Sequence, residues 1–284
     1  MKLDDLEESE HVEDRRRGGG RRVAMGGGIG TLILIVAFIL LGGDPQALVD
    51  TGVVGGSARP QAEAPASPED EELKTLVSKV LRSTENVWQA EFSLLGREYP
   101  KPNLVIFSGA VRSGCGVADA GMGPFYCPLD RQVYIDLAFY RELKQRFGAP
   151  GDFAQAYVIA HEVGHHVQHV LGLSRPLDEA RERGASEREL NALSVRLELQ
   201  ADFLAGMWAR KQEESRSFLD PGDIEEAMRC AKAIGDDALQ KRAQGYVVPD
   251  SFTHGSSEQR VRWFMRGFET GDLRRGDTFR ARDL

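Results

Sequence analysis

This 284-residue chain has few cysteines, no excess of basic residues and almost no long apolar stretches. Three cysteines are too few for a disulfide-rich scaffold, and the sequence contains no internal repeat that would indicate a solenoid or a propeller. With 36 basic and 44 acidic residues the net charge is −8, so the basic face that a nucleic-acid partner needs is not expected. One long apolar run is too little for a polytopic membrane protein. The hydrophobic fraction of 41% is nevertheless enough to bury one full core.

The long apolar run lies near the N-terminus, in residues 23–43, which include no charged residue. A helix of this length rises about 31 Å, close to the hydrocarbon thickness of a bilayer. Five arginines between positions 15 and 22 precede the run, and arginines on one flank favour the cytoplasmic side. We therefore expect an uncleaved, single-pass transmembrane helix in the inner membrane, with residues 1–22 as a cytoplasmic tail and the catalytic part extracytoplasmic (periplasmic). A cleaved signal peptide and a buried core helix are the alternatives.

The rest of the chain divides into a linker and one domain. Residues 44–70 are rich in Pro, Ala, Gly and Ser without helical or strand periodicity, so a flexible linker is expected. Residues 71–275 form the expected domain, and residues 276–284 form a C-terminal tail. Strand patterns come early in the domain and helical patterns follow, which predicts the α+β class with a small sheet. The expected strands lie in residues 103–109 and 123–137. One helix is expected to begin just after Ser67, and further helices are expected at residues 138–147, 152–171, 186–213, 221–234 and 257–270.

The helix expected at residues 152–171 contains an HExxH motif, formed by His161, Glu162 and His165. Two histidines four residues apart project from one face of a helix, so both imidazoles can reach one Zn²⁺ ion. Glu162, beside the first histidine, can take a proton from a zinc-bound water as general base. The alternative is a pair of ordinary helical histidines, but histidines beside this apolar stretch need a hydrogen-bonding or metal partner. The motif therefore predicts a zinc hydrolase site.

Two further histidines follow on the same helix. His169 lies four residues after His165, but three ligands spaced along one straight helix cannot converge on a tetrahedral ion, so His169 is expected at the rim of the site or in contact with a ligand. His166 lies about 100° round the helix axis from His165 and is expected to face solvent or to form a local hydrogen bond. The longer motif HExxHxxGxxH of the metzincins is absent, because Gln168 and Leu171 occupy its last two defined positions.

A catalytic zinc site needs a third protein ligand, and the best candidate is an acidic pair on the helix expected at residues 186–213. Glu198 and Asp202 are four residues apart, on a face that also carries Ala201 and Ala205. Such small residues allow another helix to approach closely. We expect Glu198 to bind the metal and Asp202 to accept the second ring N–H of a ligand histidine. The reverse assignment stays open, as does a pair of acids on a solvated face.

The last part of the chain offers a donor for the developing oxyanion. His254 lies in the segment THGSSEQRVRWF, with Arg260 six residues later. We expect His254 to polarise the scissile carbonyl or to stabilise the oxyanion. A histidine in a surface loop is the alternative, and the role of Arg260 is left open.

Cys115 and Cys127 flank a Gly-rich stretch that a covalent link would stabilise. If the domain lies outside the cytoplasm, a disulfide is chemically allowed there. We therefore favour a bridge between these two residues over two reduced buried thiols.

Four motifs resemble the bacterial family of neutral zinc metallopeptidases: GPFYCPLD, HEVGHHVQ, ELQAD and THGSSEQRVRWF, in this order. The resemblance covers about residues 70–270, together with the basic N-terminus and the apolar run. It implies a zincin-like domain with one Zn²⁺ ion, a gluzincin-like ligand set and hydrolysis of peptide bonds. In such peptidases the substrate strand pairs with an edge strand above the zinc helix, here around residues 132–136 or in the GPFYC segment.

The expected protein is a membrane-anchored zinc metallopeptidase of the metalloendopeptidase class. It cleaves peptides or proteins outside the cytoplasmic membrane, with Glu162 and His254 as catalytic residues and His161, His165 and Glu198 as ligands. Two alternatives stay open: a zinc amidase acting on a non-peptide bond, and a catalytically idle, membrane-tethered binding module. The intact HExxH motif argues against the idle module. The sequence specifies neither the substrate nor the oligomeric state.

Overall fold

The first long helix, α3 (Pro68–Leu94), begins where the sequence offers a reciprocal cap. The Ser67 hydroxyl accepts the Asp70 backbone N–H, and the Asp70 carboxylate accepts the backbone N–H of Ser67. The computed structural model describes residues 1–16, 67–145, 148 and 151–284. These residues form one unit, made of Met1–Arg16 and Ser67–Leu284.

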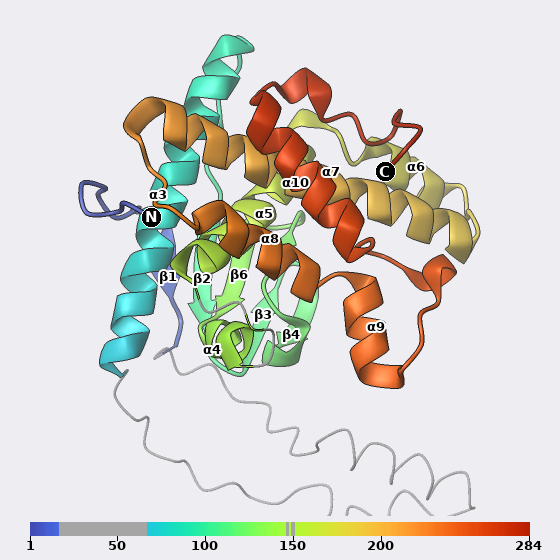
Figure 1. Cartoon of the computed structure of the whole chain (residues 1–284), viewed down its shortest axis with the longest axis horizontal. Helices are drawn as coiled ribbons and strands as arrows, with labels where there is room; N and C mark the ends of the chain where they lie inside the picture. The colour runs from blue at the N-terminus through green and yellow to red at the C-terminus, as the bar shows by residue number, and fades with distance from the viewer. Residues whose placement is uncertain (17–66, 146–147, 149–150) are drawn as a thin grey trace, which may run out of the picture. The chain divides into compact units, whose positions relative to one another are not determined.

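A four-stranded sheet lies beside α3, in the strand order β1-β2-β6-β5 (Figure 1). Strands β1 (Val12–Asp14), β2 (Asn103–Phe107) and β6 (Gln132–Asp136) are parallel. Strand β5 (Phe125–Cys127) runs antiparallel to β6 at the end of the sheet. A separate hairpin of β3 (Ala110–Ser113) and β4 (Gly116–Asp119) is tied to β5 by a disulfide between Cys115 and Cys127, the bridge that the sequence favours.

Apart from α3, which lies between β1 and β2 in the sequence, the described helices follow the strands along the chain, so the α+β class is confirmed. The central helix, α5 (Asp152–Leu171), contacts β5 and β6 on one side and α7 (Glu187–Arg216) on another. Helix α10 (Ser257–Thr270) packs along α7 (Figure 1). The other helices within the described residues are α4 (Ala138–Gln145), α6 (Arg175–Glu182), α8 (Asp223–Ala233) and α9 (Asp236–Gln244), with short 3₁₀ turns at Ala120–Met122, Pro249–Ser251 and Leu273–Arg275.

Glycines let the helices α5, α7 and α10 approach one another closely. A Cβ on Gly164 of α5 would lie 3.1 Å from the carbonyl oxygen of Ala201 on α7. The small residues on the helix face of Glu198 predicted such a close approach of another helix. Between α7 and α10, a Cβ on Gly206 would lie 1.9 Å from the Phe264 oxygen, and a Cβ on Gly267 would lie 1.9 Å from the Phe203 oxygen. No side chain larger than hydrogen fits at these two positions without moving α10.

The ends of the described unit differ from the expected division. Residues 1–16 were expected in a cytoplasmic tail separate from the domain, but they belong to the domain and supply β1. Residues 276–284 were expected as a C-terminal tail outside the domain, but Thr278 is buried and its carbonyl accepts a hydrogen bond from Arg196 of α7. Both ends therefore contribute to packing.

The expected transmembrane helix, residues 23–43, and most of the expected linker lie outside the described residues. Among the residues that the structure does describe, no helix combines the length and the apolar character needed to cross a membrane. Two helices in the described part were not predicted separately: α6, and α9, which follows α8 after a break at Gly235.

Candidate metal centre

Two facing helices bring three metal-ligating side chains together. His161 and His165 of α5 and Glu198 of α7 each offer a ligand atom, and these atoms all lie within 4.8 Å of one another. Glu198 Oε2 is 3.1 Å from His161 Nε2 and 3.5 Å from His165 Nε2. Two atoms that each bind a tetrahedral zinc ion at 2.0–2.1 Å are roughly 3.3 Å apart. The three side chains therefore fit a single zinc ion, and they leave a fourth position for another ligand.

The charge of Glu198 also suits a cation. Burial raises the pKa of Glu198, but the neighbouring imidazoles of His165 and His161 outweigh it and hold this pKa well below its usual range. Glu198 is therefore ionised at neutral pH, and an anionic oxygen beside two imidazoles is a ligand set that zinc prefers.

Asp202 forms a hydrogen bond with the ring nitrogen of His161 that faces away from Glu198. Its Oδ1 lies 2.9 Å from His161 Nδ1, so the other ring nitrogen, Nε2, is directed at Glu198. Arg260 of α10 donates to both carboxylate oxygens of Asp202, at 2.9 and 3.0 Å, and the Tyr157 hydroxyl donates to the same carboxylate. Although burial raises the pKa of Asp202, Arg260 and His161 lower it to about 2. This geometry matches Glu198 as ligand and Asp202 as orienting residue, rather than the reverse.

The second histidine is held by a chain of amides. Gln168 Oε1 lies 2.8 Å from His165 Nδ1, and the Gln168 amide donates to the Leu197 carbonyl at 2.7 Å. It also contacts Gln200, which in turn donates to the Gly276 carbonyl at 2.9 Å. The sequence singled out Gln168 only because it breaks the metzincin motif, so this role was missed.

Glu162 lies next to the ligands but is not one of them. Its side chain is buried, and it interacts electrostatically with His165, His161 and Glu198. Burial is the main cause of a pKa above the ordinary value, and the two histidines act in the opposite direction. A carboxylate with a raised pKa accepts a proton more readily, which is the property expected of a general base.

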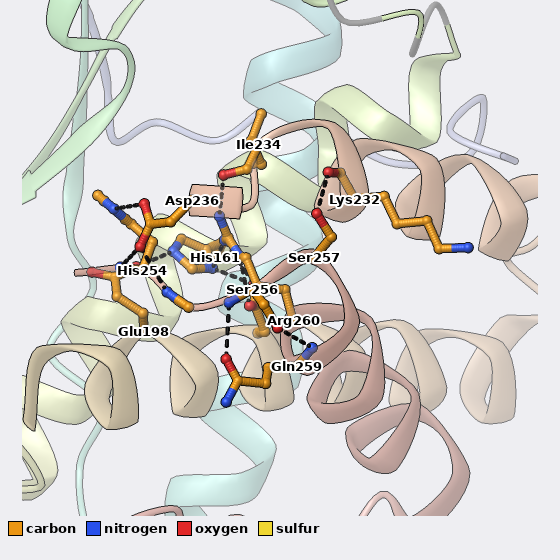
Figure 2. A network of polar contacts seen from close by, with 12 residues as sticks. His161, Glu198, Lys232, Ile234, Asp236, His254, Ser256, Ser257, Gln259 and Arg260 are labelled. Carbon is orange, nitrogen blue, oxygen red and sulfur yellow. Dashed lines mark hydrogen bonds and ion pairs between the residues drawn. The ribbon is translucent and has the colours of Figure 1, made fainter. Parts of the chain in front are cut away.

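His254 reaches this centre from a loop that Asp236 organises (Figure 2). Asp236 Oδ2 accepts the backbone N–H groups of Thr253, His254 and Gly255, at 2.8, 2.7 and 3.0 Å. Its Oδ1 lies 3.3 Å from His254 Nδ1, and this contact raises the pKa of His254. The imidazole is 52% exposed and interacts electrostatically with Glu198. His254 is therefore a half-exposed residue near Glu198, with one nitrogen toward Asp236.

The other two histidines of α5, His166 and His169, lie apart from the three candidate ligands. His166 was expected to face solvent or bond locally, but it is fully buried, 3.1 Å from the Tyr126 hydroxyl and 2.6 Å from the Pro100 carbonyl oxygen. That expectation is wrong because β5 and the segment before β2 cover this face of α5. His169 is partly exposed, with its ring centre 6.2 Å from that of Tyr126.

Sequence reasoning missed Tyr157, Gln168, Gln200 and Asp236 as parts of the centre. Tyr157 carries a weak signal, because it lies four residues before His161 and so on the same helix face. Asp236 carries a signal only for a helix start, since it follows Gly235 at the beginning of α9. Their contacts depend on how α7, α9 and α10 meet, which no local pattern encodes.

The fold and the centre together define an α+β protein with a candidate zinc site between two helices. The chain belongs to the family described as "Putative neutral zinc metallopeptidase", whose sequence profile matches residues 1–279. It is 46% identical over 288 residues to "Uncharacterized protein YpfJ" of Escherichia coli (strain K12), covering 98% of this chain and 99% of that protein. An uncharacterized protein of Mycobacterium tuberculosis (strain H37Rv) is 43% identical over 196 residues, 66% of this chain and 65% of its own length. No solved structure matches this chain.

Proposed function

We propose that this protein is a zinc-dependent metallopeptidase that hydrolyses peptide bonds. The observation that carries the proposal is the group of His161, His165 and Glu198, whose ligand atoms are spaced for one tetrahedral ion, with Glu162 beside them. The family description supports the same chemistry.

The residues of the chain have distinct tasks in this proposal. His161, His165 and Glu198 hold the zinc ion, which supplies a Lewis acid and lowers the pKa of water when bound. Asp202 fixes the tautomer and orientation of His161. Glu162 takes the proton of the attacking water and passes it to the leaving amine. His254, held by Asp236, donates a hydrogen bond to the oxygen on which negative charge develops.

Strand β5 is the edge strand of the four-stranded sheet that packs against α5, the helix of the HExxH motif. Strand β6 lies between β2 and β5, so its backbone is already paired on both sides. Strand β5 is the last strand of the sheet, contacts α5, and holds Tyr126 against His166. We propose that an extended substrate adds to the outer edge of β5, which is the GPFYC segment, rather than to residues 132–136.

The location outside the cytoplasm stays a proposal, and one observation supports it. The disulfide between Cys115 and Cys127 is of a kind that persists in oxidising compartments and is rare in the cytoplasm.

The test uses the full chain purified in detergent, with metal content and cleavage of casein and quenched fluorescent peptides measured together. We expect one zinc ion per chain and cleavage that chelators abolish. Glu162→Gln should keep the metal and lose cleavage by at least about a hundredfold, because the general base is gone. Zinc-loaded wild type that cleaves no better than Glu162→Gln would contradict a peptidase.

A further inference from the structure

Residues before the apolar run are an integral part of the domain that follows it. Strand β1 pairs with β2 in parallel register, with Val12 opposite Leu104 and Asp14 opposite Ile106. Main-chain hydrogen bonds join them: Leu104 N–H donates to the His11 carbonyl and Arg15 N–H to the Ile106 carbonyl, both at 2.8 Å. Without β1, these polar groups of β2 would have no partner in the sheet.

A buried carboxylate depends on the same segment. Glu85 of α3 has a side chain that is only 1% exposed. Ser9 donates a hydrogen bond to its Oε1, and His11 Nδ1 lies 2.9 Å from the same oxygen. Ser9 and Ser78 of α3 also bond to each other, N–H to carbonyl and hydroxyl to carbonyl, each at 3.2 Å. Removing residues 1–16 would leave Glu85 buried with fewer partners, which is costly.

The two ends of the undescribed segment lie together. Arg16 is the last described residue before the segment, and α3 begins just after it at Pro68. Arg16 Nη2 lies 3.0 Å from a carboxylate oxygen of Glu71 in the first turn of α3, and Nη1 donates to the Asp70 carbonyl at 3.3 Å. The chain therefore leaves and re-enters the domain at one place.

We propose that residues 1–16 reside in the same compartment as the domain and fold with it, so that the apolar residues 23–43 do not divide the two. A single crossing between Arg16 and Ser67 would put β1 and β2 on opposite sides of a membrane and break every contact described above. This replaces the orientation expected from the flanking arginines, in which the N-terminal residues stay in the cytoplasm and the domain is exported. If the disulfide fixes the domain outside, residues 1–16 are outside as well.

Cysteine labelling of the full chain in cells tests the shared compartment. Cys115 and Cys127 are bridged and Cys230 is buried, so the wild type should react little with a maleimide. Two single variants place a thiol at an exposed side chain: Asp5→Cys, where the residue is 96% exposed, and Arg175→Cys, where it is 78% exposed.

A membrane-impermeant maleimide is applied to spheroplasts before and after permeabilisation. We expect the two variants to behave alike, both labelled from outside or both protected until permeabilisation. The first result supports an extracytoplasmic domain and the second a cytoplasmic one, and both support a shared compartment. Labelling of Arg175→Cys from outside while Asp5→Cys stays protected, or the converse, overturns the proposal.

A crosslink tests docking in the same membranes. The double variant Ser9→Cys/Ser78→Cys should form an oxidant-dependent disulfide, found by mass spectrometry as a linked peptide pair, because the two residues are in contact. The control is Ser9→Cys/Ser93→Cys, since Ser93 lies on the same helix about 22 Å further along. Equal crosslinking in the test and control pairs, or none in either, overturns docking of residues 1–16.

Discussion

Asp202 is the residue on which the polar contacts around the candidate ligand His161 converge. It accepts from His161, from the Tyr157 hydroxyl and from Arg260, and all three partners are buried. A neutral amide at this position could not satisfy both a guanidinium and an imidazole in the same way. Asp202 therefore links the metal centre on α5 and α7 to the packing of α10.

At this position we expect Asp202→Asn to lower zinc affinity about 10- to 100-fold, the usual cost of losing the partner that orients a ligand histidine. Competition with a chromophoric chelator measures the affinity. Asp178→Asn, a change at a half-exposed acid on α6, is the matched control and should leave zinc binding unchanged. Equal affinities of Asp202→Asn and wild type would show that His161 does not need this carboxylate.

His166 gives a pH dependence of stability that is separate from catalysis. Burial lowers its pKa to about 4, from an ordinary value of 6.5. The unfolded chain therefore binds the proton more tightly than the folded chain. Above pH 6.5 His166 is neutral in both states and does not change the free energy of unfolding, and as pH falls from 6.5 toward 4 this free energy decreases. The loss between pH 7 and pH 4 is about 3 kcal/mol at most. We expect urea unfolding of His166→Gln to show a correspondingly smaller loss over this range; an identical pH profile would contradict the burial argument.

The residues of the centre that belong to a short sequence motif could be predicted, and those that act through distant parts of the chain could not. His161, Glu162 and His165 follow from one helical motif, and Glu198 follows from a spacing on a small-residue face. Asp236, in contrast, acts through the backbone of residues 253–255, seventeen or more positions away. His166 was assigned the wrong environment because helical periodicity gives its direction but not what covers it.

At the level of secondary structure elements, helix α10 is placed by two glycines that face carbonyl oxygens. Gly206 of α7 meets Phe264, and Gly267 of α10 meets Phe203. This close approach sets the distance over which Arg260 reaches Asp202. A helix was predicted at residues 257–270, and α10 has these bounds; in the structure Ser256 and Gln259 form a capping box and Gly271 ends the helix. Its partner was not predicted, because the glycines reveal their role only when the helices are side by side.

We expect Gly267→Ala to destabilise the protein by about 1–3 kcal/mol, because the added methyl group must displace the backbone of α7. The change should also weaken zinc binding by shifting Arg260. Thermal unfolding and zinc affinity measure the two effects. Glu269→Ala, at an exposed position on the same helix, is the control and should be nearly neutral. Comparable effects of the two variants would rule out the close approach as the cause.

A disulfide joins the β3–β4 hairpin to β5. Cys115 and Cys127 are separated by 12 positions, and closing a loop of about this size stabilises a fold by about 3 kcal/mol in the chain-entropy account. Cys115→Ser/Cys127→Ser should lose about 2–3 kcal/mol of unfolding free energy and gain protease sensitivity near residues 110–131. Reduced wild type should match the double variant. If reduction leaves wild-type stability unchanged, the bridge does not support this region.

For the whole molecule, the largest difference from the sequence-based prediction concerns residues 1–16. A three-residue strand such as β1 has no periodicity to detect, and its partner β2 lies some ninety positions later. The arginines between positions 15 and 22 suggested a cytoplasmic flank, yet Arg16 pairs with Asp14 and Glu71 within the domain. Local charge was therefore interpreted as a topology signal where part of it stabilises the fold.

The proposed metal site joins α5 to α7, so we expect zinc binding to stabilise the folded molecule as a whole. A ligand that binds only the native state adds about 2.7 kcal/mol of unfolding free energy at a free concentration one hundred times its Kd. The midpoint of thermal unfolding should therefore rise with zinc and fall with chelator. Glu198→Ala removes one of the three ligands and should abolish most of this shift, while Glu162→Gln should keep it, because Glu162 is not a ligand. A shift of the same size in Glu198→Ala and wild type would show that the stabilising ion binds elsewhere.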